Sequence, residues 1–260
     1  MSAQQIEYQF HDKTVVITGA SGGIGLATAR KFAQAGATVL LHANKNYKII
    51  EHLQQEIQQQ GKKCECFTAD FFSPTAAELF VRSVCEKTDK VDIWVNGAGV
   101  DLMNSSIAVL PFEKKMQQLF QVDVFATIQM STLVGSLMKN WGAGILFFLG
   151  WNGVRYGWEG TTAQLYGSAK GAIHGFSRSL AETLAPDVRV CSLSLGWIKT
   201  RWGEKTSDKY LKRGAEDSLR ERWGTPEEVA NAILFLSSDA ANYLDGLDIR
   251  LDGTKKGTKR

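Results

Sequence analysis

Tyr166 and Lys170, a tyrosine and a lysine four residues apart, are the residues of this chain best suited to acid–base chemistry. On a helix, side chains at positions i and i+4 lie on one face, so the phenol and the ammonium group can converge. A free phenol titrates at about pH 10, and a nearby cation lowers its pKa because it stabilises the phenolate. The pair therefore predicts a general acid/base, Tyr166, tuned by Lys170. A chance pair on a surface helix is the alternative.

A glycine-rich turn, Gly19-x3-Gly23-x-Gly25, follows the first apolar segment of the chain, residues 14–18. That segment is short and β-branched, which predicts a buried strand, and a helical pattern follows over 24–35. Glycines let the backbone approach an anion, and the N–H groups and dipole of the following helix attract a pyrophosphate. The spacing differs from the general G-x-G-x-x-G fingerprint, so a simple tight turn is the alternative. Its place after the first strand favours a dinucleotide site.

The residues after the second predicted strand bear on which dinucleotide binds. NAD sites usually carry an acid about 20 residues after the glycines, which binds the ribose 2′-hydroxyl. Here the first acid is Glu51, inside the next predicted helix, and the strand is followed by His42, Asn44 and Lys45. These three side chains could meet a 2′-phosphate, so the sequence predicts a preference for NADP(H), with NAD(H) as the second option. A surface loop beside a site that accepts both is the alternative.

The rest of the chain supplies the elements that must position these residues. Strands are predicted at 14–18, 38–41, 63–69, 91–95, 145–149, 188–195 and 247–251. Helices are predicted at 24–35, in the polar stretch that follows the second strand and ends near Gly61, and from a Ser73 cap with Pro74 inside the helix. Three more are predicted over 112–140, from Tyr166 to 184, and from a Thr225 cap. Residues 196–222 are predicted to be irregular. Alternating strands and helices predict one α/β domain over 1–260: a Rossmann-type, doubly wound fold whose seven-stranded parallel sheet has helices on both faces. Residues 1–12 are expected to be an N-terminal extension and 254–260 a basic tail.

Composition limits the function classes. With 44% hydrophobic residues and a net charge of only +3, the chain can bury a core and shows no basic surface typical of nucleic-acid binding. No apolar run reaches the roughly 18 residues of a membrane span, and residues 1–10 hold no hydrophobic signal core. The four cysteines include no C-x-x-C pair, so we interpret them as packing residues and expect no metal. We expect a cytoplasmic protein that acts on a small molecule.

Together these motifs resemble the short-chain dehydrogenase/reductase family, in particular the 3-oxoacyl-[acyl-carrier-protein] reductases. The matching segments are 18–25, Asn96-x2-Gly99, Tyr166-x3-Lys170, Gly196-x3-Thr200, 222–230, 235–238 and Asp252-Gly253. They cover nearly the whole chain in the family's order. The resemblance implies the fold predicted above, the activity of a carbonyl reductase, and a homo-oligomer, a tetramer or a dimer, formed through the two late helices and the last strand.

The resemblance also implies which residues bind the cofactor. The pyrophosphate would be held by Gly19, Ser21, Gly22, Gly23, Ile24 and Gly25. Asp70 would bind the adenine amino group, with Phe71 beside it, although an ordinary acid capping a turn is the alternative. The adenosine ribose would be lined by Asn96, Gly97 and Ala98. Lys170 would bind the nicotinamide ribose, and Ile198 and Thr200 the carboxamide. Tyr166 would give a proton to the substrate carbonyl oxygen.

The sequence departs from the family at two catalytic positions. The family's catalytic serine lies at the end of the fifth strand, where this chain has no hydroxyl. Asn152 could replace it through its amide N–H, and Thr161, Thr162 and Gln164 are further options. Losing such a donor costs roughly 2.7–4 kcal/mol of barrier. Asp123 stands where the family has an asparagine that holds a helix kink and a water in the proton relay. A carboxylate could still hold that water, or pair with Lys170.

Four tryptophans fall in segments that flank the substrate cleft in this family, namely Trp151, Trp158, Trp197 and Trp202. Flat apolar walls would suit a cyclic, aromatic or acyl substrate, although core or subunit contacts explain any single one equally well. Two functions follow. The chain is an NADP(H)-dependent carbonyl reductase with an altered oxygen site, or it is a catalytically impaired nucleotide-binding protein that acts as a partner or regulatory subunit. Retention of Tyr166 and Lys170 favours the enzyme.

Overall fold

Seven parallel strands form one sheet at the centre of the structure, a computed structural model that describes residues 8–103, 105–200, 206 and 208–253. The strands are β1 (Thr14–Ile17), β2 (Thr38–Ala43), β3 (Cys64–Thr68), β4 (Ile93–Asn96), β5 (Gly144–Trp151), β6 (Val188–Leu195) and β7 (Asp248–Leu251). Their order across the sheet is β3-β2-β1-β4-β5-β6-β7. The seven predicted strands and the Rossmann-type fold are confirmed. Strand order reverses between β1 and β4, which places the ligand crevice outside their carboxyl ends.

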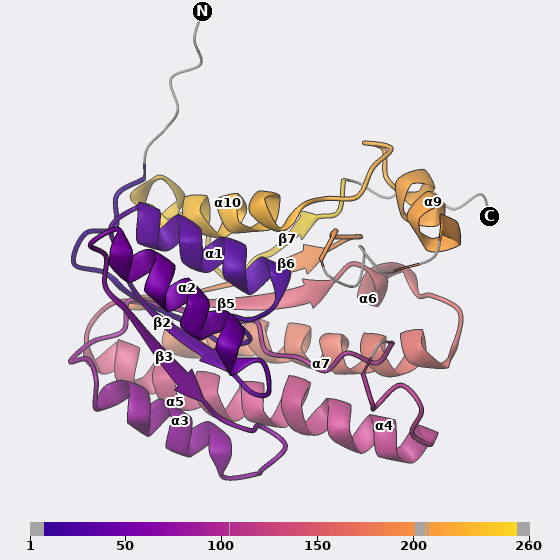
Figure 1. The fold of residues 1–260 in the computed structure, drawn as a ribbon, viewed down its shortest axis with the longest axis horizontal. Helices are drawn as coiled ribbons and strands as arrows, with labels where there is room; N and C mark the ends of the chain where they lie inside the picture. Colours follow the sequence, from indigo (N-terminus) through magenta and orange to yellow (C-terminus); the bar gives the residue numbers. More distant parts are fainter. Residues whose placement is uncertain (1–7, 104, 201–205, 207, 254–260) are drawn as a thin grey trace, which may run out of the picture.

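Helices cover both faces of the sheet, as predicted (Figure 1). One face is covered by α1 (Gly23–Gln34), α2 (Tyr47–Gln59) and α10 (Pro226–Ser237). The other is covered by α3 (Ala76–Cys85), α5 (Thr127–Asn140) and α7 (Thr161–Leu184). Each layer buries its own apolar core, with Phe32 central to the first and Trp94 to the second. Of the described helices, none is both long and apolar enough to cross a membrane.

Helix starts follow the sequence signals unevenly. At α10 the Thr225 hydroxyl accepts from the Glu228 N–H, and the Glu228 carboxylate accepts from the Thr225 N–H, so the predicted cap is confirmed as a full capping box. The predicted Ser73 cap is wrong, because α3 begins at Ala76 with Thr75 as its N-cap residue. Residues 73–76 instead form a turn in which the Ala76 N–H donates to the Ser73 carbonyl.

The remaining elements interrupt regions predicted to be uniform. The helix expected over 112–140 consists of α4 (Phe112–Leu119), a π-helical segment η1 (Phe120–Ala126) and α5. The stretch expected to be irregular contains α9 (Asp208–Asp217), and α6 (Gly153–Tyr156) and a 3₁₀ turn η2 (Asp239–Ala241) complete the elements named here. Of the predicted terminal segments, 1–7 and 254–260 lie outside the described residues, whereas Phe10 is buried against Phe32.

Candidate active site

Tyr166 lies in the second turn of α7, and Lys170 follows on the same face of that helix. The Lys170 ammonium lies 5.4 Å from the centre of the Tyr166 ring. On its other side it forms an ion pair of 3.1 Å with Asp123 of η1. Both charged side chains are buried, and the second Asp123 oxygen accepts a 2.8 Å hydrogen bond from the Val100 N–H. The pairing of Asp123 with Lys170 that the sequence suggested is therefore present.

Burial and charge act on the pKa values of this group in opposite directions. Burial raises the pKa of Tyr166, the Lys170 cation lowers it in part, and Asp123 and Asp101 raise it further. The net rise differs from the sequence expectation, because desolvation outweighs the cation. Burial also raises the pKa of the Asp123 carboxyl, against the pull of Lys170 and the Val100 N–H. Burial alone would lower the pKa of Lys170, but the interactions with Tyr166 and Asp123 outweigh burial and raise this pKa. The lysine therefore stays charged.

The glycine turn connects β1 to α1 and matches its predicted role in shape. Gly19 has a positive φ of 66°, and a Cβ there would collide with the Gly97 carbonyl group, so only glycine fits. A Cβ on Gly25 would lie 2.7 Å from Ala20 Cα, which is also too close. Gly22 is the N-cap residue of α1, with no side-chain cap and no acid in the first turn. Backbone thus approaches backbone here, and the N-terminal end of α1 faces the turn.

The loop after β4 is held against this turn by Thr18. Its hydroxyl accepts from the N–H groups of Gly97 and Ala98 at 3.0 and 3.1 Å, and it donates to the Val95 carbonyl. The Asn96 side chain is buried, and its amide donates to the Phe147 carbonyl and to the Ser131 hydroxyl, both at 3.1 Å. Asn96 thus ties β4 to β5 and α5, which accounts for the sheet-supporting part of its predicted role.

His42 lies at the end of β2, and its predicted contact with a 2′-phosphate needs correction. The ring is buried and stacks on Phe71, with the ring centres 4.3 Å apart. One ring nitrogen accepts from the Gly19 N–H at 3.3 Å, and the other lies 3.0 Å from the Ala69 carbonyl oxygen. Burial lowers the pKa of His42 to about 4, so the ring is neutral at pH 7 and both nitrogens are engaged. His42 supports the glycine turn and offers no charge to a phosphate.

Asn44, Lys45 and Asp70 lie at the same edge of the sheet. The Asn44 amide donates to the Asp70 carboxylate at 2.8 Å, and the same carboxylate oxygen accepts from the Phe72 N–H. Asp70 therefore caps a turn, as its alternative interpretation held, while remaining exposed at the predicted adenine position. The Phe71 side chain is buried in the core, so only its backbone could meet a nucleotide. Lys45 is exposed.

The segment after β6 reaches over the glycine turn. A Cβ on Gly23 would lie 3.4 Å from both Cα and Cβ of Thr200, so Thr200 packs against the start of α1. Ile198 forms an isolated parallel bridge with Gly224. The predicted carboxamide residues, Ile198 and Thr200, thus lie in a segment that contacts the candidate pyrophosphate turn.

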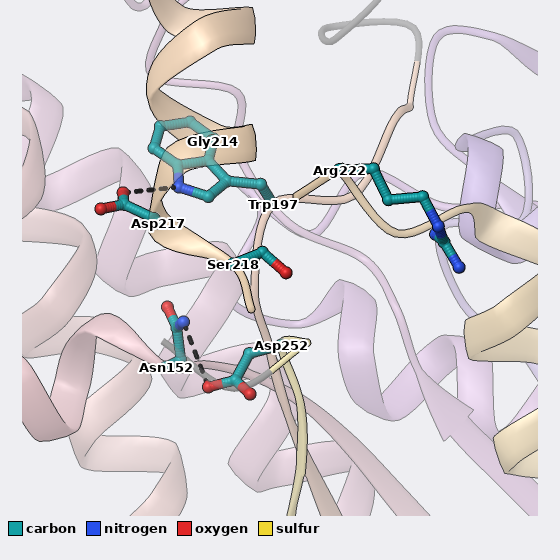
Figure 2. A pocket seen from close by; sticks show the side chains of 7 residues that line it. All are labelled: Asn152, Trp197, Gly214, Asp217, Ser218, Arg222 and Asp252. Atoms are coloured by element: carbon teal, nitrogen blue, oxygen red, sulfur yellow. Dashed lines mark hydrogen bonds between the residues drawn. The ribbon is translucent and has the colours of Figure 1, made fainter. Parts of the chain in front are cut away.

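Asn152 directly follows β5, and its predicted role as a donor to the substrate oxygen stays a prediction. Asn152 is buried, and its amide donates to the Asp252 carboxylate at 3.4 Å (Figure 2). Asp252 also accepts two hydrogen bonds from Arg250, at 3.2 and 2.9 Å. Asn152 lines a small pocket with Trp197, Gly214, Asp217, Ser218, Arg222 and Asp252 (Figure 2). The further donor options lie in the first turn of α7, where Thr161 and Gln164 are exposed and Thr162 is half-buried.

Trp151, the last residue of β5, lies next to Tyr166 instead. The two ring centres are 5.3 Å apart, edge to face. From Trp151 a run of aromatic rings continues through Trp158 to Trp197, with ring centres 6.1 and 5.5 Å apart. Three of the four predicted wall residues therefore form one cluster that reaches the candidate proton donor, and Trp202 lies outside the described residues.

Two features of the site lacked a sequence signal. Asp252 was placed in a family motif, but its hydrogen bond to Asn152 joins residues 100 positions apart. The second feature is α9, which no sequence signal predicted. Its Asp217 accepts a hydrogen bond from the Trp197 indole N–H at 3.2 Å (Figure 2). In the described part of the chain, no group of three or more His, Cys, Asp or Glu side chains could hold a metal ion.

Comparisons with known proteins agree with this fold. A family model described as enoyl-(acyl carrier protein) reductase matches residues 19–254. The sorbose reductase sou1 of Schizosaccharomyces pombe is 29% identical, over 95% of this chain and 96% of its own length. The 3-oxoacyl-[acyl-carrier-protein] reductase FabG of Thermotoga maritima is 31% identical, over 93% and 96%.

A solved structure from Beutenbergia cavernae superimposes with a TM-score of 0.84 and 26% identity, over 95% of this chain and 98% of its own. It was assigned provisionally as an NAD(P)-dependent gluconate 5-dehydrogenase and holds NADP at low occupancy. These matches span nearly the whole chain and include the glycine turn, the Tyr–Lys pair and the last strand. The chain therefore belongs to the short-chain dehydrogenase/reductase family of oxidoreductases.

Proposed function

We propose that this protein is an NADP(H)-dependent carbonyl reductase in which Tyr166 gives a proton to the carbonyl oxygen of the substrate. The observation that carries the proposal is the buried Asp123–Lys170 ion pair beside Tyr166. Its substrate class includes 3-oxoacyl thioesters, ketones and cyclic carbonyl compounds. NADP bound to the Beutenbergia cavernae relative supports the cofactor.

The shape of the glycine turn supports the binding of a dinucleotide. The turn at Gly19 is a cradle that a Cβ would fill, and it is joined through Thr18 to the loop that carries Gly97 and Ala98. Gly99 of that loop lies against Asp123, since a Cβ there would be 3.0 Å from its carboxylate. The glycine turn is therefore connected by direct packing to the acid–base group. When bound, the reduced nicotinamide supplies the hydride.

Each residue of the acid–base group then has a distinct task. Tyr166 holds the proton that it donates to the carbonyl oxygen, and Lys170 stabilises the phenolate left behind. Asp123 holds Lys170 in place and keeps it protonated. The indole edge of Trp151 excludes water from one side of the Tyr166 ring. Asn44 and exposed Lys45 bind the 2′-phosphate, where Lys45 supplies the positive charge.

The test is NADPH oxidation with a panel of carbonyl compounds, run on the wild type and on Tyr166→Phe. Removing the proton donor should lower kcat/KM by about 10²–10⁴-fold, the range of general acid catalysis, while NADPH binding is retained. Tyr243→Phe is the matched control, because Tyr243 is fully exposed on the surface, and its activity should be unchanged. Equal turnover by the wild type and Tyr166→Phe on every compound would refute the role of Tyr166.

One observation favours a second function. The amide of Asn152 is engaged by Asp252, and Trp151 is the neighbour of Tyr166 at the end of β5. The β5 end thus brings no side-chain hydroxyl to the substrate oxygen, which fits a catalytically impaired nucleotide-binding protein that acts as a partner subunit. NADPH binding without turnover across a broad panel would establish this reading and exclude the reductase.

We also propose a cytoplasmic homo-oligomer, a dimer or a tetramer. Phe235 on α10 and Leu247 beside β7 are large apolar side chains exposed in the single chain, 38% and 44% respectively. They lie on the elements that the family resemblance implies for the subunit contact. Light scattering should give a mass of two or four chains, and a monomer mass would contradict this part of the proposal.

A further inference from the structure

The indole of Trp151 is seated by two glycines. A Cβ on Gly153 would collide with its six-membered ring, so this position must stay without a side chain. On the neighbouring helix, a Cβ on Gly167 would lie 3.4 Å from Cζ3 of the same ring, so the ring also packs closely against α7. Gly167 directly follows Tyr166 in sequence. The indole is therefore held in a fitted slot next to the candidate proton donor, and its rotamer is restricted on two sides.

A second aromatic ring, that of Trp158, stacks with Trp151. Trp158 lies with its ring centre 6.1 Å away and its plane inclined by only 28°. Trp158 is in turn held by Trp197 at 5.5 Å and by the Arg213 guanidinium of α9, 4.7 Å from the Trp158 ring centre. Both Trp151 and Trp158 are half-buried, so part of each ring stays accessible. A supported aromatic cluster thus begins beside Tyr166 with the indole of Trp151.

We propose that Trp151 is a specificity-determining residue and that it selects cyclic carbonyl compounds, whose ring packs flat against the indole, over linear 3-oxoacyl thioesters. This inference rests on the proposed carbonyl-reductase function. A cyclic substrate meets a fixed flat wall with most of its conformational freedom already lost. A linear acyl chain must immobilise each rotatable bond to reach the same contact, which costs conformational entropy. The same wall therefore favours the ring.

The wild type should reduce cyclohexanone and 2-decalone with a kcat/KM at least about tenfold above that for an acetoacetyl thioester, equivalent to about 1.4 kcal/mol of discrimination. Trp151→Ala should lower kcat/KM for the cyclic ketones by about tenfold and change that for the thioester by less than about threefold. Trp151→Phe retains a flat ring and should keep most of the preference. Thermal unfolding and NADPH binding of each variant show whether the fold is intact.

Gly153→Ala provides an independent perturbation, because it displaces the indole without replacing it. It should produce the same selective loss as Trp151→Ala. Gly175→Ala is the matched control on α7, where a Cβ would meet nothing within 4 Å, and both kcat/KM values should stay at the wild-type level. Equal losses for ring and chain substrates in Trp151→Ala, or a wild-type preference for the thioester, would overturn the proposal.

Calorimetry separates this inference from the function on which it rests. Binding of 2-decalone to the NADP⁺ complex should weaken by about tenfold in Trp151→Ala and stay within about twofold in Gly175→Ala. Such binding without turnover of any carbonyl compound would refute the reductase and leave the role of Trp151 intact. Absence of 2-decalone binding to the wild type would refute the inference about Trp151, even if other carbonyl compounds are reduced.

Discussion

Replacing Asp123 by asparagine should move the pH dependence of the reaction to lower pH. The substitution keeps the shape of the side chain and an oxygen that can accept from the Val100 N–H, but it removes a buried negative charge. That charge raises the pKa of Tyr166, whereas Lys170 lowers it. Without the Asp123 carboxylate, only the smaller effect of Asp101 opposes the stabilisation of the phenolate by Lys170. The phenolate therefore forms at lower pH in Asp123→Asn than in the wild type.

The structure sets the size of this effect. The 3.1 Å from Asp123 to the Lys170 ammonium and the 5.4 Å from there to the Tyr166 ring centre add to about 8.5 Å, the largest separation of carboxylate and ring. A unit charge at about 8.5 Å, with an effective dielectric constant of about 20, changes the free energy of phenolate formation by about 2 kcal/mol. Since one pH unit corresponds to about 1.36 kcal/mol, the profile should shift by at least about 1.5 units.

The assay is alcohol oxidation with NADP⁺, followed as kcat/KM against pH. In this direction the rate rises with pH as the Tyr166 phenolate forms, so the midpoint of the rise should lie about 1.5 units lower in Asp123→Asn. Asp101→Asn is the control, because Asp101 makes the smallest of the named contributions to the pKa of Tyr166, and its midpoint should move less. A folded Asp123→Asn variant with an unmoved or raised midpoint would refute the reasoning.

Three further substitutions test other parts of the site and fold. Lys45→Ala should raise the dissociation constant of NADPH by about tenfold and leave that of NADH unchanged, because only NADPH carries the 2′-phosphate; equal effects in calorimetry would contradict this. Gly19→Ala should abolish NADPH binding, since the positive φ and the nearby Gly97 carbonyl leave no room for a Cβ. Thr225→Ala should lower the free energy of unfolding by about 1 kcal/mol and Tm by about 2–4 °C, through loss of the α10 cap. Arg222 and the Thr225 N–H lower the pKa of Glu228 to about 2, so its contribution to stability should be lost as the pH falls from about 4.5 to about 2, measurable by chemical unfolding.

The fold could be predicted from the sequence because its signals are local. Buried parallel strands are short β-branched runs, and the start of α10 carries a hydroxyl, a proline and acids at the positions of a helix N-terminus. α9 was missed because only its packing reveals it: the Trp223 indole N–H donates to the Leu211 carbonyl at 3.0 Å, and Gly214 lies against Trp223 and Trp197. The π-helical segment was missed for the same reason, since its sequence has the apolar content of an ordinary helix.

Within the site, residue types were easier to predict than their contacts. His42 follows a strand and carries a positive charge when protonated, which favoured a phosphate contact, but its stacking on Phe71 and burial keep it neutral. Asn152 has the right chemistry for an oxygen donor, yet its amide also donates to Asp252, which follows β7 and lies far away in the sequence. In both cases a partner that is distant in the sequence affects what the side chain can bind. Neither the motif spacing nor the residue type predicts that partner.

The loop after β4 is the element that joins the two halves of the site. At its start, Thr18 holds Gly97 and Ala98 against the glycine turn, and at its end Val100 donates to the Asp123 carboxylate that pairs with Lys170. A shift of this loop therefore moves the candidate nucleotide turn and the acid–base group together. Asp123 acts on the Tyr166 phenol through its charge, and the indole of Trp151 packs against the Tyr166 ring. A charge and a wall thus act on a single candidate proton donor, which is why pH profile and substrate preference are the two measurements that test this site.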